Sequence, residues 1–397
     1  MKNVIFIILV FGLEFSACSV NHSRLDSTLN ESGKLASMSL KEPSGNVSRE
    51  IPIAEGTLIP VKNMHFARAA HTATLLNDGT VLICGGFVGN SNNSLSSVEL
   101  YIPAVKSFSK INSLITPRFN QSATLLPNGK VLIAGGYNGN ALSVTEIYDP
   151  KSKTFSQGPN MNTPRYGHTA TLLHDGKILM TGGVGTEWTF LSSAEIYDTQ
   201  TNKFTTASPM SFARESHTAT LLKNGNVLIT GGHRDRRENL KVYDVAEIFD
   251  SKSNQFTPTG SMNIPRHKHD AVLLSDGKVL VNGGADKRDS LYASAEIYDP
   301  NTAQFTSISN MNYPRFKHIG TSILLSDNNV LIGGGSDKAE IYNFRTGTFT
   351  PLQGNLGTTR LFSSATLLEN GEVLITGGYD DRITARSESQ LFVKNKP

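Results

Sequence analysis

The sequence predicts an all-β fold, a seven-bladed β-propeller with four antiparallel strands in each blade. A Gly-Gly doublet recurs seven times at intervals of 43 to 52 residues, and this is the period of a four-stranded blade. Each interval contains four short runs of strand-forming residues separated by turn residues. The doublets are Gly85-Gly86, Gly135-Gly136, Gly182-Gly183, Gly231-Gly232, Gly283-Gly284, Gly334-Gly335 and Gly377-Gly378.

The first two strands of each unit are predicted to form a hairpin. In six units an Asp-Gly or Asn-Gly pair, such as Asp78-Gly79, separates two apolar runs. We expect a type I′ turn there, because both residues tolerate positive φ. The sixth unit has Asn328 in the glycine position, and Asn also tolerates the left-handed region. The second run is apolar at successive positions, so this strand is expected to be buried on both faces.

The third and fourth strands carry paired aromatic residues. Six units have a Glu, an aliphatic residue and an aromatic residue in succession on the third strand. A Phe follows seven positions after this aromatic residue. The fixed interval predicts that the two rings pack together at each blade interface. The pairs are Tyr101 and Phe108, Tyr148 and Phe155, Tyr197 and Phe204, Phe249 and Phe256, Tyr298 and Phe305, and Tyr342 and Phe349.

The last unit lacks a fourth strand, because the sequence ends soon after Gln390-Leu391-Phe392, which matches the third strand. Residues 57–63 precede Arg68 with the spacing that fourth strands have in the other units. We therefore expect this N-terminal segment to be the outer strand of the last blade. Such closure removes the sheet edges that promote aggregation. The propeller is predicted to occupy residues 56–397.

These units resemble the kelch repeat, which has a double glycine after the second strand, a Tyr on the third and an aromatic residue on the fourth. The chain carries Phe where kelch units usually have Trp. The resemblance covers residues 57–393 and implies a seven-bladed propeller of the superfamily that includes the galactose oxidase central domain. It implies no activity, because propellers include both enzymes and passive binders.

The N-terminus is predicted to be a targeting segment. Lys2 and the apolar residues 4–13 fit a signal peptide over residues 1–18. Phe15-Ser16-Ala17-Cys18 resembles the lipobox of bacterial lipoproteins, which implies lipidation of Cys18, although Phe15 departs from the usual Leu. The alternative is a secretory signal that is cut nearby. Residues 19–55 are rich in Ser, Asn, Lys and Glu, so we expect a disordered tether.

We therefore expect an exported protein of the cell envelope, lipid-anchored to a bacterial membrane and facing the periplasm or the cell surface. The net charge of +3 over 397 residues is too small to indicate nucleic acid binding. A closed ring of blades is expected to be a monomer. If Cys18 carries lipid, Cys84 is the only other cysteine and no internal disulfide can form.

One Arg precedes the first strand of every unit, and a Glu recurs on the third strand of six units. Arg–carboxylate pairing inside the blades is the favoured interpretation, and an electropositive mouth that receives acidic ligands is the alternative. Gln390 holds the Glu position of the last unit, so Arg360 is expected to lack a partner. The arginines are Arg68, Arg118, Arg165, Arg214, Arg266, Arg315 and Arg360.

No catalytic, cofactor or metal residue is predicted. His71, His168, His217, His269 and His318 each follow an Arg by three residues, which indicates repeat packing rather than a metal site. Cys84 lies in a position that holds small residues in other units, so we expect a buried, inert thiol. The resemblance to galactose oxidase would require two Tyr and two His around copper, and the loops contain no such cluster.

The loops between the second and third strands are the candidate binding surface, because they vary while the repeat residues serve packing. Trp188 is the only Trp and lies in such a loop, and an exposed Trp is a good anchor, although packing onto the blade is equally expected. The predicted ligand or partner residues are Trp188, Arg234, Arg236, Arg237, Arg288 and Arg382, together with Arg360.

Three functions fit this pattern. The first is a binding scaffold for a protein, a peptide or a glycan. The second is an enzyme similar to the kelch-type sialic acid mutarotase, in which pore arginines would bind the sugar carboxylate and a Glu would act as the base. The third is a structural part of an envelope assembly. A Glu at the pore without an Arg partner would favour the enzyme.

Overall fold

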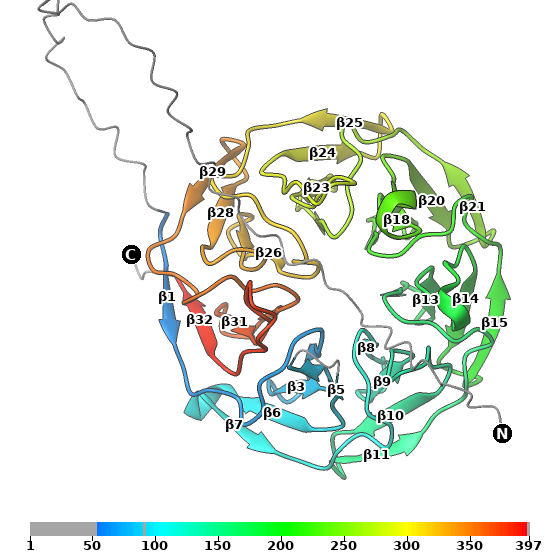
Figure 1. The fold of residues 1–397 in the computed structure, drawn as a ribbon, viewed down its shortest axis with the longest axis vertical. Helices are drawn as coiled ribbons and strands as arrows, with labels where there is room; N and C mark the ends of the chain where they lie inside the picture. Colours follow the sequence, from blue (N-terminus) through cyan, green and yellow to red (C-terminus); the bar gives the residue numbers. More distant parts are fainter. Residues whose placement is uncertain (1–53, 90–92, 395–397) are drawn as a thin grey trace, which may run out of the picture.

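Seven four-stranded antiparallel sheets surround a central axis in the structure, a computed structural model that describes residues 54–89 and 93–394 (Figure 1). The predicted fold class is confirmed. The predicted signal peptide, Cys18 and nearly all of the predicted tether lie outside the described residues. The described helices are too short to cross a membrane.

Each blade is numbered along the chain. Blade 1 contains β2 (Thr72–Leu75), β3 (Val81–Cys84), β6 (Val98–Ile102) and β7 (Ser107–Lys110). Blade 2 contains β8 (Ser122–Leu125), β9 (Val131–Ala134), β10 (Thr145–Asp149) and β11 (Thr154–Gln157). Blade 3 contains β12 (Thr169–Leu172), β13 (Ile178–Thr181), β14 (Ala194–Asp198) and β15 (Lys203–Ala207). Blade 4 contains β16 (Thr218–Leu221), β17 (Val227–Thr230), β20 (Ala246–Asp250) and β21 (Gln255–Pro258). Blade 5 contains β22 (Asp270–Leu273), β23 (Val279–Asn282), β24 (Ala295–Asp299) and β25 (Gln304–Ser307). Blade 6 contains β26 (Ser322–Leu324), β27 (Val330–Ile332), β28 (Glu340–Asn343) and β29 (Thr348–Pro351).

Blade 7 is completed by the N-terminal end of the propeller. It contains β30 (Ser364–Leu367), β31 (Val373–Thr376), β32 (Ser389–Val393) and, on the outside, β1 (Thr57–Pro60). Leu58 lies opposite Phe392 in the antiparallel β1–β32 register, and Figure 1 shows β1 and β32 side by side in this blade. The predicted closure is confirmed, with a strand that covers the first four residues of segment 57–63.

The hairpin turns differ from the expected type I′. Among the six Asp-Gly and Asn-Gly pairs only the glycine has positive φ. In the first hairpin Leu76 N donates to Thr80 O, Gly79 N donates to Leu76 O, and the Asp78 carboxylate accepts the Thr80 N–H. These bonds define a three-residue loop with a glycine bulge. The type I′ prediction was wrong because the loop includes one residue more, Asn77. Asn328 takes the glycine position in blade 6 with a φ of 70°.

The Gly-Gly doublets allow neighbouring blades to approach closely. Gly85 and Gly86 both have positive φ. A Cβ on Gly85 would lie 2.5 Å from the carbonyl oxygen of Arg118 in the next blade, and one on Gly86 would lie 2.8 Å from Ala69 O. Any larger residue would therefore be both strained and in collision with the backbone.

The core lies between the blades. The second strands are fully buried, as in β3 and β9. The six predicted aromatic pairs are in contact, with ring centroids 4.8 to 5.1 Å apart. Tyr101 and Phe108 of blade 1 pack against Leu368 and Leu374 of blade 7. The predicted aromatic interface is confirmed.

Backbone hydrogen bonds run around the central axis from blade to blade. The residue two positions after each Arg has positive φ, and these seven residues form what we call the axial ring: Ala70, Asn120, Gly167, Ser216, Lys268, Lys317 and Phe362. In six of the seven cases, the backbone N–H of an axial-ring residue donates to the carbonyl oxygen of the axial-ring residue in the preceding blade, at 2.7 to 3.0 Å. Among the described residues, the one missing bond is that from Ser216 N to Gly167 O, between blades 3 and 4.

Candidate functional site

The repeat arginines are buried inside the blades, where they bond to backbone carbonyl groups of their own blade. Arg68 is fully buried, and its Nη1 donates to Gly85 O at 2.6 Å and to Ser97 O at 2.9 Å. Its Nη2 lies 3.1 Å from Glu99 Oε1, and Glu99 also accepts the backbone N–H of His65 at 2.8 Å. The predicted Arg–Glu pair occurs in blades 1 to 6, with N–O distances of 2.7 to 3.1 Å.

Arg360 of blade 7 is also buried, but among the described residues no carboxylate lies within hydrogen-bond distance of it. Its side chain is 4% exposed, and its nearest carboxylate is that of Glu388, at 4.0 Å. The guanidinium donates instead to the carbonyl oxygens of Leu356, Gly377 and Glu388. Arg360 lines a small pocket of its own in blade 7.

The repeat histidines join neighbouring blades. His71 Nε2 lies 3.0 Å from Thr376 Oγ1 of the preceding blade, and His217 Nε2 lies 3.0 Å from Thr181 Oγ1. Burial, with the nearby Arg68 as a smaller cause, lowers the pKa of His71 to about 3. The five imidazoles are therefore neutral polar contacts between blades.

The described residues do not fit a copper centre. Cys84 is fully buried in an apolar cluster with Leu82 and Val131, and burial raises the pKa of its thiol. Within residues 54–89 and 93–394, no three His, Cys, Asp or Glu side chains are arranged to hold a metal ion.

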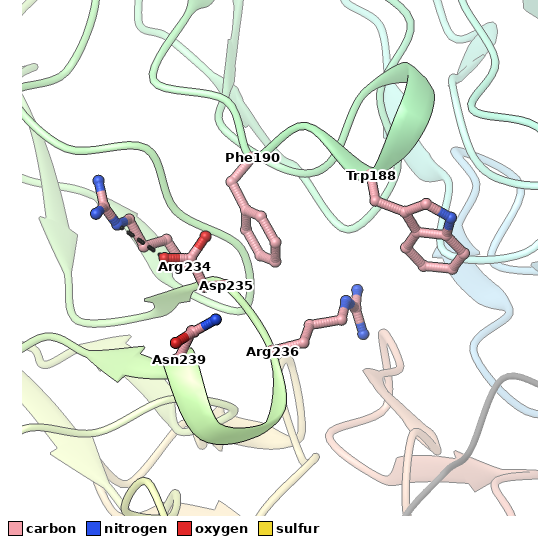
Figure 2. Close-up of a pocket in the computed structure, with 6 residues that line it drawn as sticks. All are labelled: Trp188, Phe190, Arg234, Asp235, Arg236 and Asn239. Atoms are coloured by element: carbon pink, nitrogen blue, oxygen red, sulfur yellow. Dashed lines mark ion pairs between the residues drawn. The ribbon is translucent and has the colours of Figure 1, made fainter.

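A pocket opens between the loops of blades 3 and 4, and we call it the loop pocket. Its volume is about 580 Å³, and it is lined by Trp188, Phe190, Arg234, Asp235, Arg236 and Asn239 (Figure 2). The two aromatic residues come from the loop with the short helix η2 (Thr186–Trp188). The polar residues come from the blade 4 loop, which folds as the ribbon β18 (His233–Arg234) and β19 (Lys241–Val242) around η3 (Arg237–Asn239).

The backbone of the blade 3 loop holds Trp188 in an unusual conformation. Glu187 and Trp188 have φ values of 51° and 60°, and a bulky residue in the left-handed region is costly, by about 1 kcal/mol or more. The indole packs on Tyr137 and Tyr166, with centroids at 6.0 and 6.2 Å, yet Trp188 remains 43% exposed. It is thus supported by the blades and still presents a face to solvent.

Arg236 is held between the two loops. Its guanidinium lies 5.0 Å from the ring centre of Trp188 and 5.7 Å from that of Phe190, and Figure 2 shows it extending toward Trp188. Its Nη2 lies 3.1 Å from Glu215 Oε2, while 44% of the side chain stays exposed. The contacts fix an arginine in position and leave part of it available to a ligand.

A chain of buried titratable groups lies behind Arg236. Glu215 Oε2 is 3.6 Å from His233 Nε2, and His233 Nδ1 is 3.2 Å from His267 Nδ1. Burial raises the pKa of Glu215 and lowers those of both histidines, that of His267 to about 3. The arrangement joins an exposed arginine to a carboxyl group that holds its proton more strongly than usual.

The sequence interpretation placed Trp188, Arg234 and Arg236 on the binding surface, and the structure brings these three together. Arg237 follows Arg236 in the sequence and begins η3. Arg288 and Arg382 are exposed on loops of blades 5 and 7 and do not line the pocket. Glu215 and His267 were missed. The available signal was their position directly after an Arg, where four other units have Ala, Phe or Leu.

The comparisons with known proteins agree with this architecture. The KLHDC2/KLHL20/DRC7 Kelch-repeats domain matches residues 159–335, and the Kelch motif matches residues 68–115 and 118–162. Among curated proteins, none matches the sequence. A solved fungal alcohol oxidase of the AA5 family, in complex with copper, is 18% identical, with a TM-score of 0.69 over 86% of this chain and 77% of its own. At that identity the likeness shows the fold alone.

Proposed function

Because this chain is a seven-bladed propeller of kelch repeats, we propose that it is a binding scaffold whose ligand occupies the loop pocket between blades 3 and 4. The observation that carries this proposal is Arg236, which is stacked on Trp188 and Phe190, paired with Glu215 and still exposed. A rigid aromatic face beside a fixed cation is the typical composition of a binding hot spot.

The lining indicates the chemistry of the ligand. The exposed face of Trp188 suits a sugar ring or a flat side chain, while Arg234 and Arg236 suit an acidic group. The cavity is open rather than enclosed, which suits an extended partner. We therefore propose a glycan or peptide that carries a negative charge, and a protein surface that presents such a group is included.

The cellular setting is a further part of the proposal. Lys2, the apolar residues 4–13 and Cys18 support export and lipid anchoring to a membrane of the cell envelope. Metabolic labelling with a fatty acid analogue tests the anchor. The native chain is expected to incorporate the label, and Cys18→Ala is expected to lose it; equal labelling of both would contradict the anchor.

Glycan and peptide arrays test the binding function. We expect Trp188→Ala and Arg234→Ala each to weaken binding at least about tenfold, because they remove a central anchor and a cation. Arg288→Ala is the matched control, since Arg288 is exposed outside the pocket. A ligand bound equally by all variants would place the binding surface elsewhere.

A sugar-modifying enzyme, such as a sialic acid mutarotase, is the second candidate, and Glu215 is the observation that favours it. This glutamate is buried, burial raises its pKa, and it pairs with the exposed loop arginine Arg236 rather than with a repeat arginine. Arg236 would bind the sugar carboxylate, and Glu215 would transfer the proton. Anomer exchange of N-acetylneuraminate, followed by NMR, tests it. Acceleration that Glu215→Gln abolishes supports the enzyme, and no acceleration contradicts it.

A further inference from the structure

Blades 1 to 6 show what the repeat arginine binds when its site is complete. In blade 2, Glu146 Oε1 accepts Arg118 Nη2 at 2.7 Å and the backbone N–H of Thr116 at 2.9 Å. Glu146 Oε2 accepts the N–H of Ile115 at 2.8 Å. The same carboxylate position, bounded by a guanidinium and by backbone N–H groups, is filled from the third strand in every one of these blades.

Blade 7 has the arginine without the carboxylate. Gln390 occupies the third-strand position, and its Oε1 is buried and accepts no hydrogen bond from the described residues. Arg360 Nη2, the atom that reaches the Glu elsewhere, donates to Leu356 O at 2.9 Å. Glu388 is the nearest substitute, but its side chain is 44% exposed, and it also lies 3.8 Å from Arg386.

A pocket of about 220 Å³ lies at this place. Arg360, Arg386, Glu388, Gln390, Gly357 and Thr358 are among the residues that line it. The volume is below the range of about 300–1,000 Å³ that holds a complete drug-sized ligand. It is therefore suited to one functional group of a larger molecule, or to a very small acid.

We propose that this blade 7 pocket binds a carboxylate from outside the chain, which takes the position that the Glu side chain occupies in the other six blades. Guanidinium groups recognise carboxylates through paired, charge-assisted hydrogen bonds. Arg360 is already desolvated and oriented by its bonds to Leu356, Gly377 and Glu388. The ligand is either a free organic acid or the acidic side chain of a peptide. This site is separate from the loop pocket and does not depend on its function.

Thermal unfolding with acetate as the probe tests the proposal. A ligand that binds only the folded state raises the melting temperature. At 100 mM, we expect sodium acetate to raise the Tm of the full chain by about 1–2 °C over sodium chloride of equal ionic strength. Acetamide, a neutral molecule of the same shape, is expected to have no effect. Equal effects of acetate and chloride would overturn the proposal.

Gln390→Glu is the decisive variant, because it restores the residue that six blades contain and is therefore expected to fold. We expect it to raise the Tm without acetate and to abolish the acetate response. An unchanged acetate response in Gln390→Glu would show that acetate binds elsewhere and would overturn the proposal. Trp188→Ala is the control for the loop pocket and is expected to keep the full response.

Two short peptides distinguish the sources of the carboxylate. Acetyl-Gly-Glu-Gly-amide and acetyl-Gly-Gln-Gly-amide differ only in the acidic group. Stabilisation by acetate and by the Glu peptide but not by the Gln peptide, with both effects lost in Gln390→Glu, assigns the pocket to an acidic side chain. Stabilisation by acetate and by neither peptide assigns it to a free acid. If acetate and both peptides leave the Tm unchanged, the pocket does not bind carboxylates.

Discussion

Glu99 Oε1 lies 3.1 Å from Arg68 Nη2, and both side chains are fully buried. Neither charge contacts water, so each depends on the other and on the backbone groups around them. The pair joins the segment before the first strand to the third strand of the same blade. Because the geometry recurs in six blades, it is a structural constant of this propeller rather than a binding site.

Removing one member of such a pair is expected to be costly. Glu146→Gln should lower the free energy of unfolding by about 3 kcal/mol, because it leaves Arg118 charged, buried and unpaired. Denaturation in urea measures the loss, and Glu369→Gln, a substitution of an exposed glutamate, is the control. A loss no larger than that of the control would mean that the pair contributes little.

The closure of blade 7 by β1 is expected to be essential for stability. A chain that begins at residue 61 lacks β1, exposes the edge of β32 and removes Leu58 from its core cluster. We expect its Tm to fall by about 5 °C or more, with aggregation through the free edge. A chain that begins at residue 54 keeps β1 and is the control. Scanning calorimetry and light scattering measure both effects, and equal melting of the two chains would contradict the closure.

The stability of the propeller is expected to fall in acid through its buried histidines. Burial lowers the pKa of His168 from 6.5 to about 3, so between these pH values the unfolded chain binds a proton that the folded chain does not. Stability is therefore complete above pH 6.5 and decreases as the pH falls toward 3. The contribution of His168 should reach about 3 kcal/mol between pH 6.5 and 4.

Blade 2 supplies the variant that isolates this effect. Gln121 holds the position of the repeat histidine and donates to Cys84 O at 2.9 Å, so a Gln fits the site. His168→Gln should reduce the slope of unfolding free energy against pH in this window. Urea denaturation at a series of pH values measures the slope. An unchanged slope would show that His168 does not carry the acid sensitivity.

The fluorescence of Trp188 is expected to report the charge of the loop pocket. Trp188 is the only Trp in the sequence, and Arg236 lies 5.0 Å from its ring centre. A nearby cation concentrates anions, so iodide should quench the emission more strongly than caesium. Arg236→Gln should reduce the difference, and Arg288→Gln should not. Equal quenching by the two ions in the native chain would contradict the positive character of the pocket.

The fold and the contacts of the recurring residues could be predicted from the repeat. Residues that recur in phase, such as Gly85, Tyr101 and Arg68, have the same surroundings in each blade, so their spacing predicts their contacts. The hairpin turn was missed because an Asp-Gly pair fits more than one loop length. The residue that lengthens the loop differs from hairpin to hairpin, for example Asn77, Pro127 and His174, so no recurring residue type revealed it.

The candidate site was predictable only in part. Trp188 and Arg236 could be assigned to loops, but their contact depends on how the loops of blades 3 and 4 fold toward each other. Glu215, His233 and His267 come from two blades and meet near the axis. They occupy repeat positions, directly after the Arg or after the Gly-Gly doublet, that pair with each other in most blades. The titratable side chains at these positions depart from the repeat, so the repeat alone did not reveal a cluster of such groups.

The missing hydrogen bond of the axial ring lies between the same two blades as the loop pocket. Six of the seven junctions are locked by a backbone hydrogen bond, whereas Ser216 and Gly167 share none. The axial ring is therefore expected to open first at this junction, where blades 3 and 4 stay joined by the Gly183 N–H, which donates to Arg214 O, and by His217. A ligand that contacts both Trp188 and Arg234 would resist this opening and stiffen the entire molecule. Slower amide hydrogen exchange around Ser216 would then be the earliest sign that the pocket is occupied.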